Sequence, residues 1–240
     1  TKTRHAHLID FARAVKQLET LLSSEAKGYA LETLYSKVPE ILQGYVELSY
    51  DLNNNPTFRF FEQLLYRSCF YDTSCQSIAL SKVTQESTRP FIFSTPTLKN
   101  ENTVHLPIAF AHQGLDELCR MKTNPQSLDD ICSHLNIEIE NKKLFTSFFT
   151  EEPPPCNSKY TGDKVRIKYF GHACILIETK NVSILVDPII SYNYDSDIPR
   201  YTYQDLPDWI DYVLITHCHQ DHFLPETLIQ LRHKIGCVVV

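Results

Sequence analysis

Seven consecutive residues carry the clearest chemistry in this sequence: Thr-His-Cys-His-Gln-Asp-His, at positions 216–222. Three imidazoles and one carboxylate so close together are side chains that transition metals accept as ligands. In an extended segment alternate side chains point the same way, so we expect His217 and His219 to reach one cation. Asp221 and His222 stand at the turn that follows. They are expected to reach a second cation, which predicts a two-metal site.

The elements around this motif are predicted to hold it at one edge of a sheet. A mostly apolar strand over 212–216 leads into the motif, and a helix over 225–235 follows it. Pro225 near the first turn and Gly236 just past the end suit such a helix. The apolar run 237–240 then begins another strand, so the pattern indicates a βαβ crossover. Residues at the carboxyl end of a parallel strand are well placed for binding.

Upstream of this crossover the predicted secondary structure differs between two regions. Residues 1–150 are predicted to be mostly helical, with apolar spacings of three and four in several runs: 8–22, 31–38, 39–48, 58–65, 114–121 and 127–135, the last with Ser127 as N-cap. Short β-prone pieces interrupt them at 77–83, 90–94 and 103–106. After residue 162, three β-rich runs predict a β-meander: 165–170, 174–178 and 182–186.

A Pro-rich segment separates the mostly helical region from the β-rich region. The stretch 151–161 begins with two glutamates and three prolines, a composition typical of a stiff spacer with little to bury. We therefore expect three parts: an N-terminal helical and β domain over 1–150, a linker over 151–161, and a metal-binding domain over 162–240.

Composition narrows the function classes further. The formal net charge is −6 and the sequence pI about 5.9, which disfavours nucleic acid and anionic membranes as partners. No apolar run approaches the roughly 18 residues of a membrane span, and no secretory signal opens the sequence, so we expect a cytoplasmic protein. The eight cysteines form no Cys-x-x-Cys pair, and we expect all of them to be reduced.

The motif at 216–222 also carries a resemblance. Thr-His-x-His-x-Asp-His after a hydrophobic strand resembles the metallo-β-lactamase superfamily, whose αββα sandwich binds two metals at the sheet edges. The segments 171–174 and 185–188 are similar to signatures of its lactonase-like branch. By that resemblance Asp187 lies near the ligand histidines and orients an imidazole from outside the ligand set, although capping the turn at Pro188 stays open. His172 is expected to be a core, turn or supporting histidine rather than a ligand.

A closer resemblance covers nearly the whole chain. Four segments are similar to the non-haem di-iron β-hydroxylases of nonribosomal peptide pathways, of the chloramphenicol-pathway type: 58–68, 201–207, 210–216 and 226–232. In that family an N-terminal helical and β domain precedes a metallo-β-lactamase-like domain. The fold implied here is an α+β N-terminal domain followed by the first part of an αββα sandwich.

The same resemblance implies a function. It is O2-dependent hydroxylation at the β-carbon of an aminoacyl group held as a thioester on a carrier protein, with two irons and electrons from an external donor. Carried over residue by residue, His217 and His219 bind one iron, and Asp221 and His222 bind the other. The expected partners are the carrier protein, the electron donor, and a second copy that binds through residues 1–150 to form a homodimer.

The length of the metal-binding part departs from the family. Residues 162–240 supply 79 positions, against the roughly 200 expected of the whole sandwich. The remaining ligands are missing, so we expect an incomplete and inactive fragment whose metal, iron or zinc, is undecided. The alternatives are a zinc-dependent hydrolase acting on a lactone, phosphodiester or thioester, and a non-catalytic docking module. The N-terminal domain weighs against a simple hydrolase.

Overall fold

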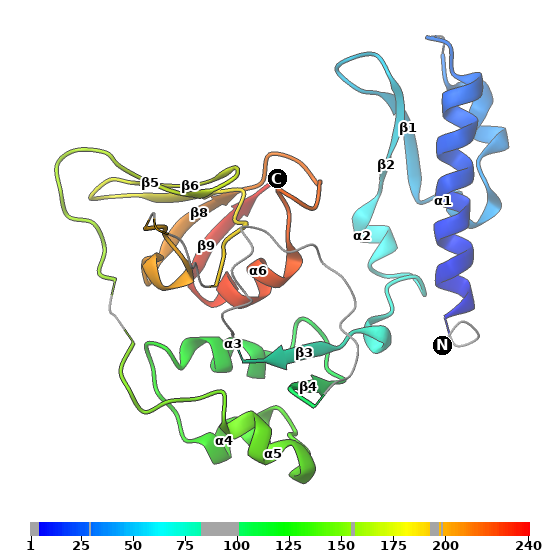
Figure 1. Ribbon diagram of the computed structural model, residues 1–240. Helices are drawn as coiled ribbons and strands as arrows, with labels where there is room; N and C mark the ends of the chain where they lie inside the picture. Colours follow the sequence, from blue (N-terminus) through cyan, green and yellow to red (C-terminus); the bar gives the residue numbers. More distant parts are fainter. Residues whose placement is uncertain (1–4, 29, 83–100, 155–156, 193–196, 198) are drawn as a thin grey trace. The chain divides into compact units, whose positions relative to one another are not determined.

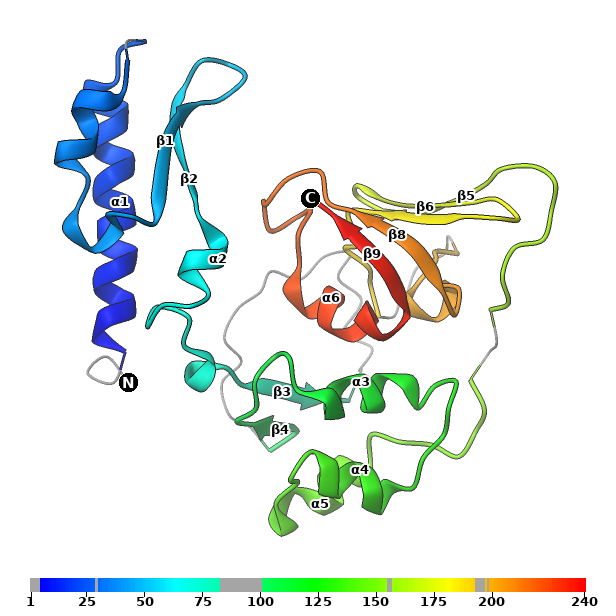
Figure 2. The same ribbon diagram turned by 180° about the vertical axis from the view of Figure 1, so that it is seen from behind.

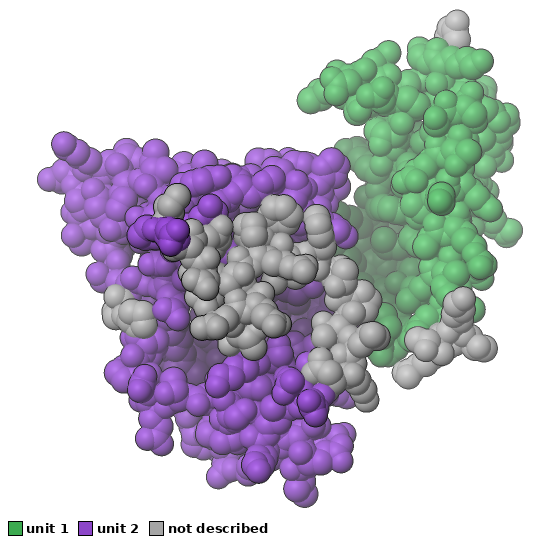
Figure 3. Space-filling view, viewed as in Figure 1, with its two compact units in different colours: residues 1–75 green, residues 76–240 purple. Residues whose placement is uncertain are grey.

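The chain forms two compact units, residues 1–75 and 76–240 (Figure 3). The computed structural model describes residues 5–28, 30–82, 101–154, 157–192, 197 and 199–240. This division differs from the sequence-based one, because residues 76–150 belong to the same unit as the β-rich segment. The three-part division with a linker at 151–161 stays a prediction.

Unit 1 is a helix packed on a β-hairpin (Figure 1). Its elements are α1 (Ala6–Glu25), two short 3-10 helices (Glu32–Lys37 and Glu40–Leu42), β1 (Val46–Tyr50), β2 (Pro56–Phe60) and α2 (Glu62–Leu65). Their apolar side chains form one core: Ala14, Leu18, Leu22, Leu31, Leu34, Val38, Leu42, Val46 and Leu48. The helix predicted over 8–22 is confirmed. In the described part of the chain, no helix has the length and apolar character needed to cross a membrane.

One helical prediction in unit 1 is wrong and another holds only in part. The run 39–48 is a 3-10 turn followed by β1. The run 58–65 begins with the end of β2, and only its second half forms the short helix α2. The reason is cross-strand pairing, since Leu48 faces Phe58 in the antiparallel hairpin. Such pairing outweighs local helical spacing when both strands bury one face against a helix.

The first part of unit 2 combines a two-stranded sheet with three helices. Strands β3 (Ile78–Ser81) and β4 (Thr103–Leu106) pair antiparallel, and α3 (Gln113–Arg120), α4 (Leu128–His134) and α5 (Ile139–Thr146) follow. The β-prone pieces at 77–83 and 103–106 and the last two helical runs are confirmed, whereas the predicted strand 90–94 lies outside the described residues. Ser127 caps α4 as predicted, because its side chain accepts the backbone N–H of Asp130 at 3.2 Å.

A five-stranded mixed sheet forms the second part of unit 2 (Figure 1). In spatial and chain order its strands are β5 (Arg166–Gly171), β6 (Cys174–Glu178), β7 (Ser183–Val186), β8 (Ile210–Leu214) and β9 (Ile235–Val239). The first three form an antiparallel meander. The last three are parallel, and α6 (Pro225–Leu231) crosses between β8 and β9. The predicted meander and βαβ crossover are both confirmed.

The two faces of this sheet differ in what covers them. One face packs against α6 (Figure 2) around a buried core: Phe170, Cys174, Leu176, Leu185, Ile190, Leu206, Ile210, Val213, Ile215 and Leu231. The opposite face, here the outer sheet face, carries half-buried or exposed apolar side chains: Ile167, Tyr169, Ile175, Ile177, Ile184, Val186, Tyr212, Leu214 and Val239. Ile167 and Tyr169 are 65% and 59% exposed. A sheet that is apolar on both faces is built to be covered on both.

Arg232 connects the two parts of unit 2. Its Nε donates to Asp116 Oδ1 at 2.6 Å, and its terminal nitrogens donate to the backbone carbonyls of Phe110 and His112. Ile229 of α6 packs against the apolar cluster formed by β4 and helices α3 to α5. These contacts explain why residues 76–150 fall into one unit with the five-stranded sheet.

Candidate metal centre

The residues predicted to bind metal lie together at one end of the five-stranded sheet. The segment 216–222 follows β8 and precedes α6, His172 lies in the turn between β5 and β6, and Asp187 directly follows β7. Strands β7 and β8 are parallel, and the N–H of Asp187 donates to the carbonyl of Leu214 at 2.9 Å. The residues that follow these two strands therefore meet at the same edge.

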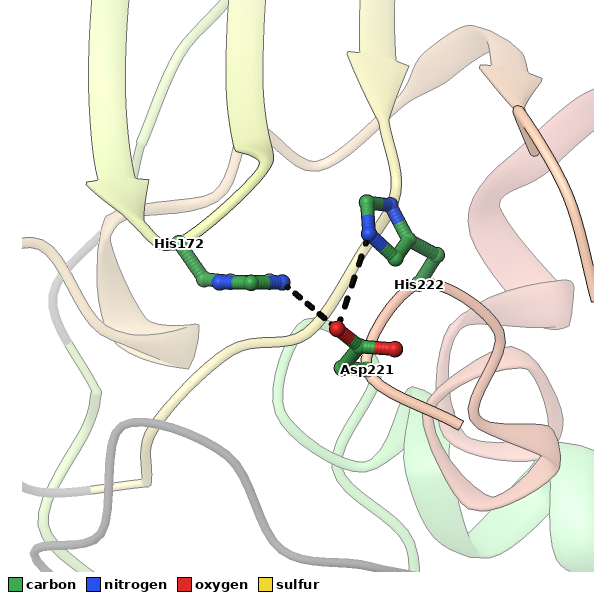
Figure 4. Close-up of side chains that lie close together, drawn as sticks. All are labelled: His172, Asp221 and His222. Carbon is green, nitrogen blue, oxygen red and sulfur yellow. Dashed lines mark hydrogen bonds and ion pairs between the residues drawn. The ribbon is translucent and has the colours of Figure 1, made fainter. Parts of the chain in front are cut away.

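Asp221 lies between two imidazoles (Figure 4). Its Oδ2 is 3.2 Å from His172 Nε2 and 3.7 Å from His222 Nε2. Some desolvation raises the pKa of Asp221, but its own backbone N–H and the imidazoles of His222 and His172 lower it more, so the net shift is downward. Among the described residues, these three form a group whose ligand atoms all lie within 4.8 Å of one another. Such a group can hold one cation.

His217 and His219 form the neighbouring part of the cluster. His217 Nε2 lies 3.1 Å from His219 Nδ1, so both rings present a nitrogen to the same small volume. The ring of His217 is also close to that of His222, with centroids 4.0 Å apart. The cluster therefore brings all four predicted ligands into one continuous site.

Asp187 is the buried anchor of the cluster. It is 2% exposed and accepts three hydrogen bonds, each of 2.8 Å, from the Thr216 N–H, the Thr216 hydroxyl and His222 Nδ1. Burial alone would raise its pKa, but the hydrogen bonds from His222 and Thr216 outweigh burial and lower it. A carboxylate in this position fixes the ring of His222 with Nε2 turned toward Asp221.

Two of these residues hold the left-handed backbone conformation that L-residues avoid. His172 has φ +48° and Asp187 has φ +40°, and Gly171 next to His172 has φ +115°. Such positions cost about 1–3 kcal/mol each and persist where surrounding contacts fix them. Here the turn between β5 and β6 and the three hydrogen bonds to Asp187 supply those contacts, so the local strain serves to aim two side chains at the cluster.

The donor set suits a borderline transition metal. Imidazoles and carboxylates are the ligands that iron and zinc share, and both carboxylates of the cluster have lowered pKa values. The nearby thiol of Cys174 does not belong to the set, because burial raises its pKa to about 12 and keeps it protonated.

Sequence reasoning named six residues of this site and missed a seventh. The structure brings His217, His219, Asp221 and His222 together, with His172 and Asp187 in direct contact with them. Their roles as ligands or supports stay predictions. The missed residue is Thr216, whose hydroxyl contacts Asp187 and two of the rings. Thr216 is the first residue of the motif, but its sequence position alone assigned it no role in the site.

The sheet and its cluster define the class of this domain. Residues 166–237 match the family model of the beta-lactamase superfamily domain. Residues 1–153, more than half of the chain, match the model described as the diiron non-heme beta-hydroxylase N-terminal domain. The chain therefore belongs to the diiron non-heme β-hydroxylase family, and its fold is an α+β N-terminal domain followed by the first part of an αββα sandwich.

Individual relatives agree with this assignment. The chain is 34% identical over 250 aligned positions to the 4-amino-L-phenylalanyl-CmlP-peptidyl-carrier-protein 3-hydroxylase of Streptomyces venezuelae, an alignment that covers 100% of this chain and 46% of that protein. The crystal structure of CmlA, a diiron β-hydroxylase from Streptomyces venezuelae, is similar with a TM-score of 0.67 and 32% identity, covering 98% of this chain and 45% of that one. A Staphylococcus aureus metal-dependent hydrolase is 33% identical over 76 residues, 32% of this chain and 30% of that protein. The chain thus spans about half the length of the hydroxylase it matches.

Proposed function

We propose that the full-length protein is a di-iron oxygenase that hydroxylates the β-carbon of an aminoacyl group tethered to a carrier protein. The observation that supports this most directly is the combination of an imidazole and carboxylate cluster with an N-terminal region that matches the hydroxylase family model over residues 1–153. In this proposal His217 and His219 hold one iron, while Asp221 and His222 hold the other. When bound, the two irons supply the activation of O2 that side chains alone do not perform.

The remaining residues of the cluster act on these ligands. Asp187 holds the ring of His222 through Nδ1. His172 pairs with Asp221 at 3.2 Å and steadies its carboxylate. Asp187 is only 2% exposed, and this burial strengthens its hydrogen bond with His222. The chain's own contribution is therefore to present four ligand atoms in fixed orientations.

The proposed partners follow from the relative's activity. The Streptomyces enzyme acts on a peptidyl-carrier-protein substrate, so we propose a carrier protein bearing an aminoacyl thioester as the substrate here. An external electron donor completes the reaction, because reducing O2 to one hydroxyl and one water requires two electrons beyond those of the C–H bond. A homodimer through residues 1–150 is proposed as the assembly. The proposed boundary at 151–161 is supported by the two family models, which end at residue 153 and begin at residue 166.

A zinc-dependent hydrolase remains the alternative. It is favoured by the similarity of the metal-binding segment to the Staphylococcus aureus metal-dependent hydrolase. That alignment covers only 32% of this chain, whereas the hydroxylase alignment covers 100%. A docking module without catalysis is the third candidate, and the clustering of four proposed ligands weighs against it.

The experiment is iron loading and turnover of the full-length protein. We expect two irons per chain by elemental analysis and a product that requires both O2 and reductant. His217→Ala and Asp221→Ala are expected to lose iron, because each removes a ligand that no neighbour replaces. His134→Ala is the matched control, since this histidine lies on α4 and pairs with Glu117. A protein that prefers zinc and hydrolyses a thioester or lactone without O2 would replace the hydroxylase proposal with the alternative.

The 240-residue chain alone is predicted to be inactive. Its four proposed ligands are about half of those that a dinuclear site requires. We therefore expect it to bind iron weakly and at less than two ions per chain, which the same elemental analysis measures.

A further inference from the structure

The hydroxyl of Thr216 lies at the centre of three polar side chains. Its Oγ1 is 2.8 Å from Asp187 Oδ2, 3.0 Å from His217 Nδ1 and 3.4 Å from His222 Nδ1. The backbone N–H of the same residue donates to Asp187 Oδ1 at 2.8 Å. Thr216 is therefore held at two points by one carboxylate, and its oxygen faces two proposed ligand rings.

The direction of each hydrogen bond follows from the number of protons available. An Asp carboxylate at neutral pH only accepts. The single hydroxyl proton of Thr216 therefore goes to Asp187, and the hydroxyl oxygen can only accept from its other neighbours. His217 Nδ1, at 3.0 Å, must then carry the proton that it shares with this oxygen.

His222 must also carry a proton on Nδ1, but its acceptor is Asp187 itself. Its Nδ1 lies 2.8 Å from Asp187 Oδ2 and must carry a proton to make that bond. With Nδ1 engaged in this way, Nε2 is the nitrogen of each ring that is left for a metal. In both rings Nε2 faces the ligand cluster: that of His217 lies 3.1 Å from His219 Nδ1, and that of His222 lies 3.7 Å from Asp221 Oδ2.

We propose that Thr216 is a positioning residue that fixes His217 in the Nδ1–H tautomer, in parallel with the action of Asp187 on His222. Asp187 orients His222 directly, and it orients His217 through the hydroxyl of Thr216. In both histidines Nε2 is then the nitrogen that is left to bind metal. The inference rests on the proposed function only in taking these rings as iron ligands, since the tautomers themselves are a property of the metal-free chain.

The test is the tautomer of each ring in the metal-free 240-residue chain with 15N-labelled histidine. Long-range 1H–15N correlation spectra distinguish Nδ1–H from Nε2–H imidazole. The wild type is expected to show Nδ1–H for both His217 and His222. In Thr216→Val, which keeps the backbone N–H but loses the hydroxyl, the tautomer ratio of His217 is expected to shift toward Nε2–H by about fivefold, the factor that one hydrogen bond of ordinary strength supplies.

His222 and Thr216→Ser serve as controls. His222 should keep Nδ1–H in Thr216→Val, because Asp187 still accepts from it, and an unchanged His222 signal also reports an intact fold. Thr216→Ser restores the hydroxyl and should restore the wild-type ratio at His217. A wild-type His217 in the Nε2–H form, or an unchanged ratio in Thr216→Val, would overturn the inference.

A second readout measures metal directly. Zn²⁺, a redox-silent probe, is expected to bind Thr216→Val about 10–100-fold more weakly than the wild type, the usual effect of losing a residue that orients a ligand. Thr216→Ser should stay within about threefold of the wild type. Failure of the proposed oxygenase activity would leave the tautomers unchanged. Conversely, finding His217 in the Nε2–H form would contradict the role of Thr216. It would not bear on the proposed oxygenase activity, which is tested separately by O2-dependent product formation.

Discussion

Replacing Asp187 by Asn should separate its effect on metal binding from its effect on stability. The carboxylate accepts from the Thr216 N–H, the Thr216 hydroxyl and His222 Nδ1, all at 2.8 Å. An Asn amide keeps one accepting oxygen, and its NH2 group then faces the hydroxyl and the imidazole. The hydroxyl can turn and accept, but His222 can accept only by moving its proton to Nε2, where the metal would bind.

The magnitudes follow from these bonds. Losing an orienting partner costs about 10–100-fold in metal affinity, or about 1.4–2.8 kcal/mol. Losing one hydrogen bond to a charged group costs about 1.5–3 kcal/mol of folding stability at neutral pH. Because the folded-state pKa of Asp187 is lowered, its contribution to stability is present above the unfolded pKa of about 3.9 and is lost as pH falls through the folded value. In Asp187→Asn the loss of folding stability on acidification should be smaller by this contribution.

The assay is competition of the chain with a chromophoric chelator for Zn²⁺, combined with urea unfolding between pH 3 and pH 7. Asp211→Asn is the matched control, since Asp211 also accepts a backbone N–H and a hydroxyl, both from Ser183, and its pKa is also lowered despite burial. It should lose comparable stability and keep its metal affinity. Wild-type metal affinity in Asp187→Asn, or an equal loss in Asp211→Asn, would refute the orienting role.

Three further predictions concern the rest of the chain. Burial lowers the pKa of Lys234 to about 8, so the unfolded chain binds more protons between pH 8 and about 10.4. Wild-type stability should therefore rise by up to about 3 kcal/mol across that window relative to Lys234→Met, measured by urea unfolding. Alkylation at pH 8 followed by mass spectrometry should modify exposed Cys218 and spare Cys174, whose pKa burial raises to about 12; equal rates would contradict this. Limited proteolysis should cut first within 151–161, and a first cut inside α1 would speak against the proposed linker.

Local signals in the sequence predicted the elements whose stability is decided locally. Ser127 was recognisable as an N-cap because its partner is three residues away. The strands of the meander were recognisable because their turns are short and each strand pairs with its chain neighbour. The run 39–48 failed for the opposite reason, since Leu48 belongs to a strand only when Phe58 is opposite it. Helical and alternating spacings overlap in so short a run, and the distant partner decides.

In the candidate site, too, residues close together in sequence could be predicted, whereas contacts between distant residues could not. The four ligand candidates His217, His219, Asp221 and His222 could be named from spacing alone, because they lie within six consecutive positions. Asp187 and His172 were suggested only by resemblance, since 29 and 49 residues separate them from their partners Thr216 and Asp221. Thr216 was missed because a hydroxyl beside a metal motif has no distinctive spacing. Only the parallel pairing of β7 with β8 brings its oxygen to a buried carboxylate.

The outer sheet face has a consequence for handling this chain in the laboratory. Its nine apolar side chains lie half-buried or exposed beside the edge strand β9, a combination that favours association between copies. The net charge of −6 opposes that association by repulsion, and it vanishes near the sequence pI of about 5.9. Precipitation on mild acidification is therefore expected to begin while the chain is still folded. Purification above about pH 7.5 at moderate salt keeps the repulsion, whereas sulfate salts strengthen the apolar attraction.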